Sequence, residues 1–375
     1  MFEEANNIQE KNTQKKKRVV VIGASGKKGS EYIAAIMKRN DLEIVGLVIN
    51  KHTSPLVADL ESRGVRVIRN GHIDQLLTNI SFDIAVVSVP HSEHRLVTQA
   101  LLHADKYVIK EKPLAMSITE AEEYDAIISV NHLPPVFTTV QRDSLPSFLN
   151  AKEDLHLIGQ PISFQYDYWF NLPSVTTGWR AQMMTAGGGV VLDMGYHAID
   201  VIIKFFGKPN AISASMSYKY QETEQEALED YAEITMEYTT DSLQGKLVLD
   251  RHADVKKESF TIHGSHGYIV IQPQGYQVFN LEHKLIKELH CVLSKDELTE
   301  RMFEKAIPIM MNTEQLHHDF TRNRHNVETI DRIYACRKTK LNDFQALSLF
   351  SPKTTNHKDS VDLDRVASGT HHAEL

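Results

Sequence analysis

Near its amino terminus the chain reads RVVVIGASGKKG (residues 18–29). The β-branched run predicts a buried strand, the glycines Gly23, Gly26 and Gly29 predict a tight turn, and the amphipathic residues that follow predict a helix. A dinucleotide pyrophosphate requires such a turn, because the backbone must come close to the phosphates and a helix N-terminus supplies free N–H groups. The spacing is GxxGxxG where the usual fingerprint is GxGxxG. The prediction of a cofactor turn therefore depends on its place between a strand and a helix, and a plain turn without ligand is the alternative.

The same alternation of strand and helix continues to residue 142. Strands are predicted at residues 18–22, 43–49, 65–68, 84–89, 107–109 and 135–140. Helices are predicted at residues 28–39, 54–62, 73–77, 93–103 and 117–129. This rhythm is typical of βαβ units and predicts an α/β fold that begins with a Rossmann domain, a doubly wound parallel sheet over residues 18–142. A polar N-terminal arm, residues 1–17, precedes it.

The pattern changes after residue 143, where a second domain is expected in a chain of 375 residues. Strands are predicted at residues 162–170, 211–218, 231–238, 243–249, 259–262 and 268–271, and helices at 147–155, 189–206, 296–310 and 313–335. The closely spaced strands predict a C-terminal α/β domain over residues 143–350 with a large open, mostly antiparallel sheet. Residues 351–375 are polar and aperiodic, which predicts a disordered tail.

The composition argues against several classes of partner. The formal net charge of −8 gives no attraction to a nucleic-acid backbone or an anionic membrane, so neither partner is expected. Cys291 and Cys336 lie far apart and indicate neither a disulfide framework nor a thiolate zinc site, which fits a reducing compartment. No apolar run approaches bilayer length and the first seventeen residues hold no apolar signal segment, so a cytoplasmic protein is predicted.

Two further segments carry a resemblance to a known family. The first comprises SVPHSEH (88–94) and YVIKEKPL (107–114), followed by a helix containing Glu120 and Ala121, and the second is GGGVVLDMGYHAID (187–200). In this order they resemble the Gfo/Idh/MocA oxidoreductases, over roughly residues 18–340. The resemblance implies a Rossmann domain, then an α/β domain whose open sheet often mediates oligomers, here a dimer or tetramer. Two positions depart from the pattern, Asp105 where the family usually has Gly and Asn50 where it has an acid.

The cofactor expected from the glycine turn and the resemblance is NAD or NADP. Asn50 can hydrogen-bond a ribose hydroxyl, and the missing negative charge beside Lys51 would tolerate a 2′-phosphate. A solvated loop lysine is the alternative for Lys51. The predicted cofactor-binding residues are Gly23, Ser25, Gly26, Lys27, Lys28, Gly29, Asn50, Lys51, Val89, Pro90, His91, His94, Glu111 and Lys112.

Lys112, His197 and Asp193 are the predicted catalytic residues. Lys112 follows a parallel strand at its carboxyl end, the edge where open α/β sheets place ligands, although a surface lysine in a turn would look the same without the resemblance. On the predicted helix 189–206 the positions 193, 197 and 200 share one face, so Asp193, His197 and Asp200 form a polar stripe on a largely apolar helix. His197 suits proton exchange and Asp193 could orient it. A satisfied core histidine and a metal site shared by Asp193 and His197 are the alternatives, but no third ligand is evident and no metal is predicted.

A small sugar-like molecule is the predicted partner. The predicted substrate-binding residues are Lys112, Arg142, Tyr168, Trp179, Arg180, Asp193 and His197. Trp179 could cover a sugar face and Arg180 could hold an anionic group. Tyr166 and Tyr168 share one side of a strand, so sheet packing or a subunit interface explains them equally well.

These residues predict an NAD(P)-dependent dehydrogenase or reductase that acts on a secondary alcohol or ketone of a sugar, polyol or sugar derivative. In the oxidative direction His197 would remove the hydroxyl proton and Lys112 would stabilise the oxyanion. Two rival functions remain, an NAD-dependent glycoside hydrolase that uses transient oxidation and a non-catalytic regulator that senses a dinucleotide or sugar.

Overall fold

The computed structural model describes residues 15–50, 52–172, 178–218, 228–239 and 242–339. Lys51, most of the N-terminal arm and the tail predicted to be disordered lie outside these described residues. The described residues belong to one compact unit that contains two β-sheets.

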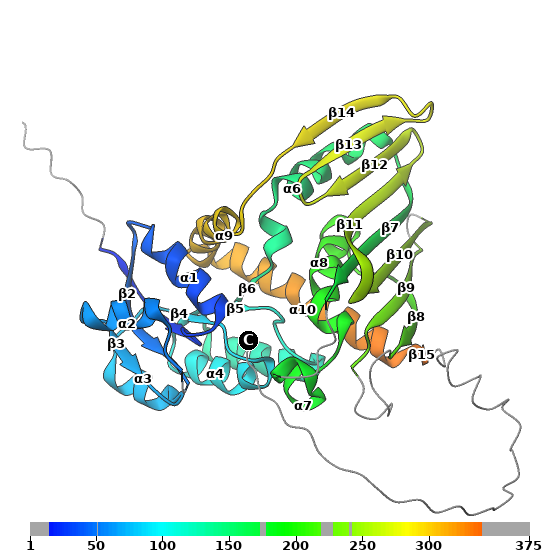
Figure 1. Ribbon diagram of the computed structural model, residues 1–375. Helices are drawn as coiled ribbons and strands as arrows, with labels where there is room; N and C mark the ends of the chain where they lie inside the picture. The colour runs from blue at the N-terminus through cyan, green and yellow to red at the C-terminus, as the bar shows by residue number, and fades with distance from the viewer. Residues whose placement is uncertain (1–14, 51, 173–177, 219–227, 240–241, 340–375) are drawn as a thin grey trace, which may run out of the picture. The chain divides into compact units, whose positions relative to one another are not determined.

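Six parallel strands form the first sheet, sheet A, in the order β3-β2-β1-β4-β5-β6 (Figure 1). The strands are β1 (Lys17–Ile22), β2 (Leu42–Val48), β3 (Arg66–Ile68), β4 (Ile84–Val87), β5 (Tyr107–Glu111) and β6 (Phe137–Thr139). The crossover helices are α1 (Lys27–Met37), α2 (Pro55–Ser62), α3 (Ile73–Asn79), α4 (His91–His103) and α5 (Ile118–Asn131). The strand order reverses between β1 and β4, so the carboxyl ends of these two strands form the switch point at which such sheets bind ligands. The predicted Rossmann domain is confirmed.

Nine strands form the second sheet, sheet B, in the order β14-β13-β12-β11-β7-β10-β9-β8-β15. They are β7 (Pro161–Asn171), β8 (Ala211–Ser217), β9 (Tyr231–Tyr238), β10 (Leu243–Asp250), β11 (His252–Gly264), β12 (Gly267–Gln272), β13 (Gly275–Asn280), β14 (Leu285–His290) and β15 (Arg337–Thr339). Among the described strands of sheet B only the pairs β7–β10 and β8–β15 are parallel, so the prediction of a mostly antiparallel sheet is confirmed. The sequence patterns missed β13, β14 and β15.

Helices from the second half of the chain lie on one side of sheet B (Figure 1). The second half contains α6 (Pro146–Glu153), α7 (Met183–Ala186), α8 (Tyr196–Phe206), α9 (Lys295–Met310) and α10 (Thr313–Ala335), with 3₁₀ turns η1 (Gln141–Ser144), η2 (Asp154–Ile158) and η3 (Trp179–Ala181). Helix α9 returns to sheet A and packs on α1, where the rings of Tyr32 and Phe303 meet edge to face with centroids 5.6 Å apart. The division of the chain at residue 142 stays a prediction, since α9 contributes to both halves.

The predicted helix 189–206 is not regular from its first residue. Its first turn is a π-helix, η4 (Val191–Gly195), and the α-helix α8 begins only at Tyr196. The carboxylate of Glu229 accepts hydrogen bonds from the N–H groups of Gly189 and Val191, and the Glu229 carbonyl accepts one from Val190. These contacts hold the irregular first turn in place, and π-turns of this kind are frequent at functional sites.

The irregular start also divides the predicted polar stripe. Asp193 contacts Lys112, whereas Asp200 accepts a hydrogen bond from Asn326 at 2.8 Å and pairs with Arg322 at 3.3 Å. Asp200 is therefore used inside the protein and does not share the partners of Asp193.

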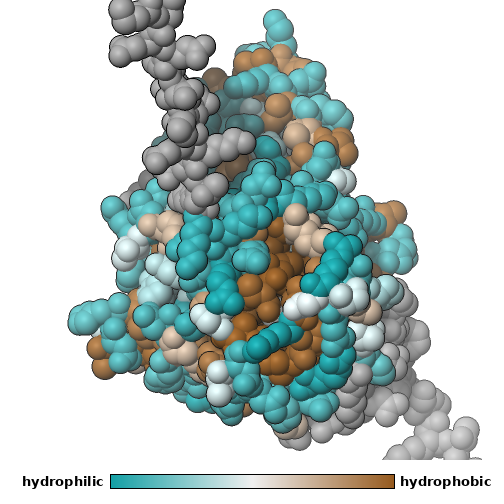
Figure 2. Space-filling view, turned by 90° about the vertical axis from the view of Figure 1, so that its left-hand side faces the viewer, coloured by the Kyte–Doolittle hydropathy of each residue, from teal (hydrophilic) through white to brown (hydrophobic). Residues whose placement is uncertain are grey.

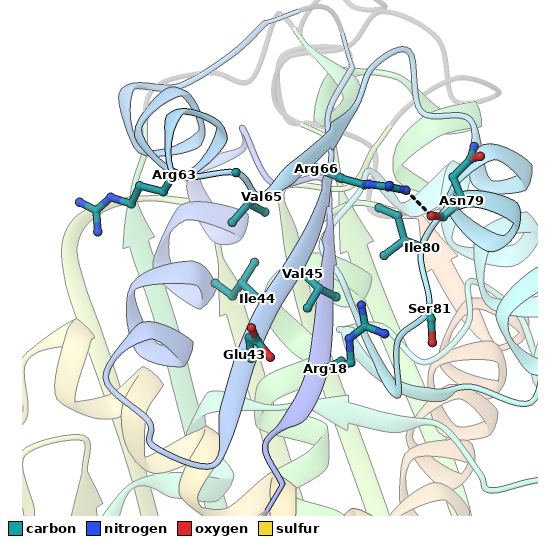
Figure 3. Close-up of a pocket in the computed structure, with 11 residues that line it drawn as sticks. Arg18, Glu43, Ile44, Val45, Arg63, Val65, Arg66, Asn79, Ile80 and Ser81 are labelled. Atoms are coloured by element: carbon teal, nitrogen blue, oxygen red, sulfur yellow. Dashed lines mark hydrogen bonds between the residues drawn. The ribbon is translucent and has the colours of Figure 1, made fainter.

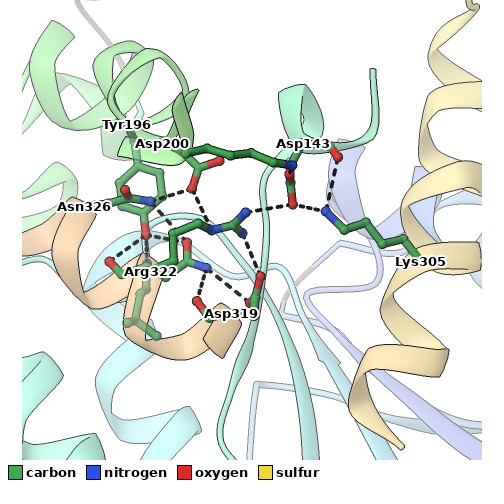
Figure 4. Close-up of polar contacts among 10 residues, drawn as sticks. Asp143, Tyr196, Asp200, Lys305, Asp319, Arg322 and Asn326 are labelled. Atoms are coloured by element: carbon green, nitrogen blue, oxygen red, sulfur yellow. Dashed lines mark hydrogen bonds and ion pairs between the residues drawn. The ribbon is translucent and has the colours of Figure 1, made fainter. Parts of the chain in front are cut away.

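Asp200 belongs to a buried group of charged side chains that we name the junction cluster (Figure 4). Its members are Asp143, Asp200, Lys204, Lys305, Asp319 and Arg322. Arg322 lies at its centre, 3.0 Å from Asp143 and 2.7 Å from Asp319, and Asp143 also pairs with Lys204 and Lys305. Three cations balance three carboxylates, and the pairs join α8 to η1, α9 and α10. The cluster thus fixes the helix that carries Asp193 and His197 at its start.

Replacing Asp319 with asparagine is expected to stabilise the protein above pH 6. Burial raises the pKa of Asp319 from 3.8 to about 6, although Arg322 opposes the shift. The folded state therefore binds this proton more tightly than the unfolded state, and the stability that results is lost as the pH rises from about 4 to about 6. A neutral isostere avoids this loss, so Asp319→Asn should gain on the order of 2 kcal/mol at pH 8 and almost nothing at pH 4.

Urea unfolding of both proteins at pH 4, 5, 6 and 8 tests this expectation. The matched control is Asp254→Asn, because Asp254 is exposed on β11, and its unfolding should follow the parent at each pH. A variant that is less stable than the parent at pH 8 would show that the Asp319 carboxylate contributes more through Arg322 than its burial costs.

Candidate active site

In the glycine turn after β1 there is no space for a side chain at Gly23 or Gly29. Gly23 has a φ of +84°, and a Cβ on it would lie 2.7 Å from the carbonyl oxygen of Ser88. A Cβ on Gly29 would lie 2.3 Å from the carbonyl oxygen of Gly23, so α1 packs directly on the turn. Gly26 caps α1 without a side-chain hydrogen bond, which leaves the first-turn N–H groups to a ligand. These residues fit a dinucleotide pyrophosphate.

Other predicted cofactor residues gather at the same switch point. The N–H of Gly23 donates to the carbonyl of Val48 at the end of β2, and the Ser88 hydroxyl donates to the carbonyl of Ile22 at 3.1 Å. Val89 and Pro90 follow directly, and Asn50 is exposed just beyond β2. Ser25, Lys27 and Lys28 are partly or fully exposed at the turn. Lys51 lies outside the described residues.

Three side chains predicted to bind the cofactor are used within the protein. His94 donates from Nε2 to the carbonyl of Val89 at 3.0 Å, and His91 donates from Nδ1 to the carbonyl of Ala186 at 2.8 Å. Glu111 accepts hydrogen bonds from Tyr32 and, at 3.0 Å, from Thr139. Burial lowers the pKa of both histidines, that of His91 to about 3, so both are neutral at pH 7. Their contacts fix the backbone of the turns around the site.

Lys112 and Asp193, which are 81 positions apart, meet at the carboxyl edge of sheet A. Lys112 follows β5 and forms a cis peptide bond with Pro113. Its ammonium donates to the Asp193 carboxylate at 2.8 Å and to the Asp193 carbonyl at 2.6 Å. The lysine side chain is only 7% exposed. Two of the three ammonium protons are committed to Asp193, and the third is available to a substrate oxygen.

Asp193 lies among three cations. Arg180 is 3.3 Å and Arg251 is 3.6 Å from its carboxylate, in addition to Lys112. Burial alone would raise the pKa of Asp193, but the three cations together hold it well below its usual range. Asp193 is therefore ionised throughout the neutral range and keeps Lys112 in place. The sequence patterns missed Arg251, and the only signal for it was a charged triplet, Asp250 to His252, between two predicted strands.

His197 lies buried on α8 beside the same groups. Its pKa is well below the usual value, first because of burial and then because of Arg142 and Lys112. The ring is consequently neutral at pH 7 and can accept a proton. Its Nδ1 atom is fully buried and has no hydrogen-bond partner among the residues that the structure describes. A buried ring nitrogen without a partner is costly in a closed core, which favours a role in binding over a satisfied core histidine.

The side chains of Arg142 and Tyr168 are hydrogen-bonded within the protein. Arg142 forms a two-pronged pair with Glu258 at 3.0 and 2.7 Å and donates to the Tyr168 hydroxyl at 2.5 Å. Tyr166 donates to Glu258 at 3.0 Å and is completely buried, so it packs within the sheet and does not form a subunit interface. Glu258 neutralises the Arg142 charge in the structure, and the role of Arg142 in substrate binding stays a prediction.

Trp179 and Arg180, both predicted to bind substrate, lie beside His91 and Asp193. They lie in η3, where the Trp179 ring is 4.6 Å from the His91 ring and the Arg180 guanidinium stacks 4.2 Å above Trp179. Arg180 also reaches Asp193, and its side chain is 49% exposed. This pair forms one wall of the site.

A second lysine, Lys110, lies completely buried below the turn that carries Lys112. Its ammonium donates to the carbonyl of Leu114 at 2.5 Å and lies 4.8 Å above the Tyr124 ring. Glu120, which accepts a hydrogen bond from the N–H of Met116 at 2.9 Å, supplies a nearby negative charge. Lys110 thus anchors the far end of the turn Glu111–Leu114. Burial lowers its pKa to about 8.

Replacing Lys110 with methionine is expected to lower kcat about tenfold with little change in stability, because the turn loses its anchor and Lys112 its alignment. The free Leu114 carbonyl costs about 1–3 kcal/mol. Folding lowers this pKa from 10.5 to about 8, so the buried ammonium destabilises the protein as the pH falls below 10.5 and fully below 8. Removing the Lys110 ammonium therefore raises the free energy of unfolding by about 3 kcal/mol at pH 7. This gain nearly offsets the cost of the free Leu114 carbonyl.

Steady-state kinetics and urea unfolding at pH 7 check this expectation. Lys106→Met, just before β5, is the matched control and should keep the parental kcat. A purely structural role for Lys110 would reduce stability and leave kcat per folded molecule unchanged, which would contradict the positioning role.

One cavity of the described residues lies away from this site, at the other edge of sheet A. A cavity of about 430 Å³ lies at the amino-terminal ends of the strands, bounded by Arg18 at β1, Glu43 at β2 and Arg66 at β3 (Figure 3). Figure 2 looks onto this side of the protein and shows apolar residues gathered in a hollow with a hydrophilic rim. β3 pairs only with Gly46–Val48, so the first half of β2 has no strand partner on the β3 side. Ligands of open α/β sheets bind at the opposite, carboxyl edge.

Neither a metal cluster nor a membrane span is found in the described part of the chain. No group of three or more His, Cys, Asp or Glu side chains there could hold a metal ion. None of the described helices has both the length and the apolar character that crossing a bilayer requires.

The fold and the site together define the class of NAD-binding Rossmann oxidoreductases. Residues 17–134 match the oxidoreductase family model with an NAD-binding Rossmann fold, and residues 154–270 match the GFO/IDH/MocA C-terminal domain. The chain belongs to the Gfo/Idh/MocA oxidoreductase family. The expected cofactor class, NAD or NADP, agrees with the matched Rossmann domain.

Individual relatives show similarity over part of the chain. The 1,5-anhydro-D-fructose reductase of Ensifer adhaerens is 31% identical over 35% of this chain and 39% of its own length. The scyllo-inositol 2-dehydrogenase (NADP(+)) of Bacillus subtilis is 26% identical over 44% of this chain and 46% of its own. The chain spans about half the length of the first curated relatives it matches. A 3-ketoreductase from Actinomadura kijaniata, solved with NADP and TDP-benzene, shares the fold with a TM-score of 0.73 at 16% identity, over 86% of this chain and 98% of that one.

The departure at Asp105 leaves the local backbone intact. Asp105 has a φ of +53°, in the left-handed region that glycine adopts most easily and that aspartate tolerates. Its N–H donates to the carbonyl of Leu102 at 2.9 Å and closes the turn between α4 and β5. The substitution therefore preserves the turn that leads to Lys112.

Proposed function

We propose that this protein is an NAD(P)-dependent dehydrogenase or reductase that acts on a secondary alcohol or ketone of a sugar, polyol or sugar derivative. The observation that carries the proposal is the meeting of Lys112, Asp193 and His197 beside the glycine turn. Relatives named for reactions on anhydrofructose and inositol support a polyhydroxylated substrate.

Each of the three side chains has a distinct task in the oxidative direction. A bound nicotinamide would supply the hydride acceptor. Neutral His197 accepts the hydroxyl proton, and the free proton of the Lys112 ammonium hydrogen-bonds the developing oxyanion. Asp193 holds the ammonium in place through its carboxylate and its carbonyl. In the reductive direction the same groups return the proton to the carbonyl oxygen.

The test is an absorbance assay for the reduced cofactor with NAD and NADP separately, against sugars, sugar phosphates, amino sugars and inositols. Reduced cofactor that accumulates with one substrate, and with the parent protein far faster than with Lys112→Ala, is the expected result. Glycoside cleavage without such accumulation would favour the hydrolase, and cofactor binding without turnover of any substrate would favour the sensor. Absence of cofactor binding would overturn the proposal.

The exposed Asn50 after β2 supports use of both cofactors. Asn50 can donate to a ribose hydroxyl and brings no negative charge that would repel a 2′-phosphate. We expect binding of NAD and NADP with affinities that differ by no more than about tenfold.

We also propose a cytoplasmic homo-oligomer, a dimer or tetramer, that forms through sheet B. On β9 the side chains of Ala232, Ile234, Met236 and Tyr238 are buried, while the alternate residues face away from the core. No described helix covers that second face of the sheet (Figure 1). Light scattering coupled to size-exclusion chromatography would give the mass, and a monomer at micromolar concentration would contradict this.

A further inference from the structure

Arg251 is a buried cation beside Asp193. Its residue is 3% exposed, and it occupies the bend between β10 and β11. Its backbone is fixed on both sides, because its N–H donates to the carbonyl of Asp230 and its carbonyl accepts from the N–H of Leu172. Its guanidinium makes no hydrogen bond to a described side chain and has only the ion pair with Asp193 at 3.6 Å. A guanidinium has five N–H donors, so one ion pair at this distance leaves donors for a ligand.

Charge at the site is not balanced either. Lys112, Arg180 and Arg251 share one carboxylate, that of Asp193. Arg142 cannot take part in this balance because Glu258 already pairs with it. Asp193 accepts hydrogen bonds from Lys112, so the two arginines retain most of their capacity to bind an anion.

The remaining titratable groups around the site add no negative charge. His91 and His197 are neutral at pH 7, and the nearby cations are part of the reason. Lys28, at the glycine turn, is paired with Glu31 at 2.7 Å. Tyr168, which interacts electrostatically with Asp193, keeps its proton because burial raises its pKa. Lys112, Arg180 and Arg251 therefore outnumber by two the one carboxylate that they share, that of Asp193.

The phosphates of a cofactor would not restore this balance at Arg251. They belong at the N-terminus of α1, where the free N–H groups and Lys27 meet them. Arg180 and Arg251 instead come from η3 and the end of β10, on the side of the site built by the second half of the chain.

We infer that the substrate carries an anionic group, a carboxylate or a phosphate, which binds Arg251 and Arg180 beside Asp193. The planar fork of a guanidinium matches both anions through paired N–H donors. The inference rests on the proposed function, since it names the substrate class of that same site. The polyol part of the substrate then extends toward Lys112 and His197.

Matched ligands that differ only at one end test the inference. Sorbitol, gluconate and sorbitol 6-phosphate share a carbon chain, and the last two distinguish carboxylate from phosphate. Calorimetric titration into the protein saturated with NAD or NADP should show at least one anion binding about tenfold or more tighter than sorbitol, as expected for one strong charged hydrogen-bond pair. Raising the salt concentration should weaken the anion and leave sorbitol unchanged.

Variants assign the preference to the two arginines. Arg251→Gln and Arg180→Gln should each lower the ratio of anion to sorbitol affinity about tenfold. Lys256→Gln, an exposed lysine on β11, is the control and should keep the ratio. If Arg251→Gln does not fold, judged by its circular dichroism, Arg180→Gln decides because its side chain is half exposed.

The outcomes separate this inference from the proposed function. Equal affinity of all three ligands, no binding of either anion, or an unchanged ratio in Arg180→Gln would overturn the anionic group, even if reduced cofactor forms with a neutral sugar. Anion binding that depends on the two arginines, without reduced cofactor from any substrate, would uphold the anionic group and overturn the dehydrogenase.

Discussion

Lys112→Ala is expected to lower kcat by roughly 10²- to 10³-fold, the usual effect of removing one donor to a developing oxyanion. Lys112 donates two hydrogen bonds to Asp193 and keeps a third ammonium proton for the substrate. Asp193 retains Arg180 and Arg251 after the substitution, so it does not become an unpaired buried charge. Steady-state kinetics with saturating cofactor give kcat, and calorimetry gives the cofactor affinity, which should change less than about threefold.

The matched control is Lys208→Ala, since Lys208 is an exposed lysine that pairs with Glu328 away from the site. It should keep the parental kcat. Retention of more than about a tenth of kcat in Lys112→Ala would mean that another group stabilises the oxyanion, and would remove Lys112 from the proposed mechanism.

Arg322→Met is expected to cost about 3–5 kcal/mol of the free energy of unfolding at pH 8. Arg322 joins Asp143, Asp200 and Asp319 inside the junction cluster, and all three carboxyl groups are buried (Figure 4). Methionine fills a similar volume, so the loss is mainly electrostatic. Urea unfolding followed by circular dichroism measures it.

Two further measurements test whether this loss is specific to Arg322. They are its pH dependence and the effect of replacing a neighbouring arginine. Asp319 binds a proton below about pH 6, so one of the three carboxylates is neutral there and the loss should be smaller at pH 5 than at pH 8. Arg324→Met, two positions further on α10, removes a half-exposed arginine that pairs with Asp125 and should cost less than about 1 kcal/mol. Equal losses in the two variants would show that the junction cluster does not depend on Arg322.

Local periodicity predicted most elements well because each is defined by residues close in sequence. The helix predicted at residues 313–335 and the strand predicted at 231–238 have those bounds in the structure. β14 was missed because five of its six residues are exposed and none is buried, so its sequence carries no alternation. It is a strand because its backbone pairs with β13, which is a tertiary effect.

The π-turn at Val191–Gly195 was missed for a related reason. The residues from 189 to 206 form a good helical pattern, but the carboxylate of Glu229 binds the N–H groups of its first turn. That contact spans forty positions, and no local pattern contains it.

By itself the sequence determined the Rossmann half, because hydrophobic periodicity is a local property. Its short motifs also predicted the cofactor turn at Gly23–Gly29 and the three residues Lys112, Asp193 and His197. Only the tertiary structure decided which charged side chains are available to bind a ligand. It paired Arg142 with Glu258, placed Asp200 in the junction cluster and brought Arg251 to Asp193 from the end of β10. The physical reason is that a side chain's charge is useful to a ligand only when no buried partner neutralises it, and buried partners come from distant parts of the chain.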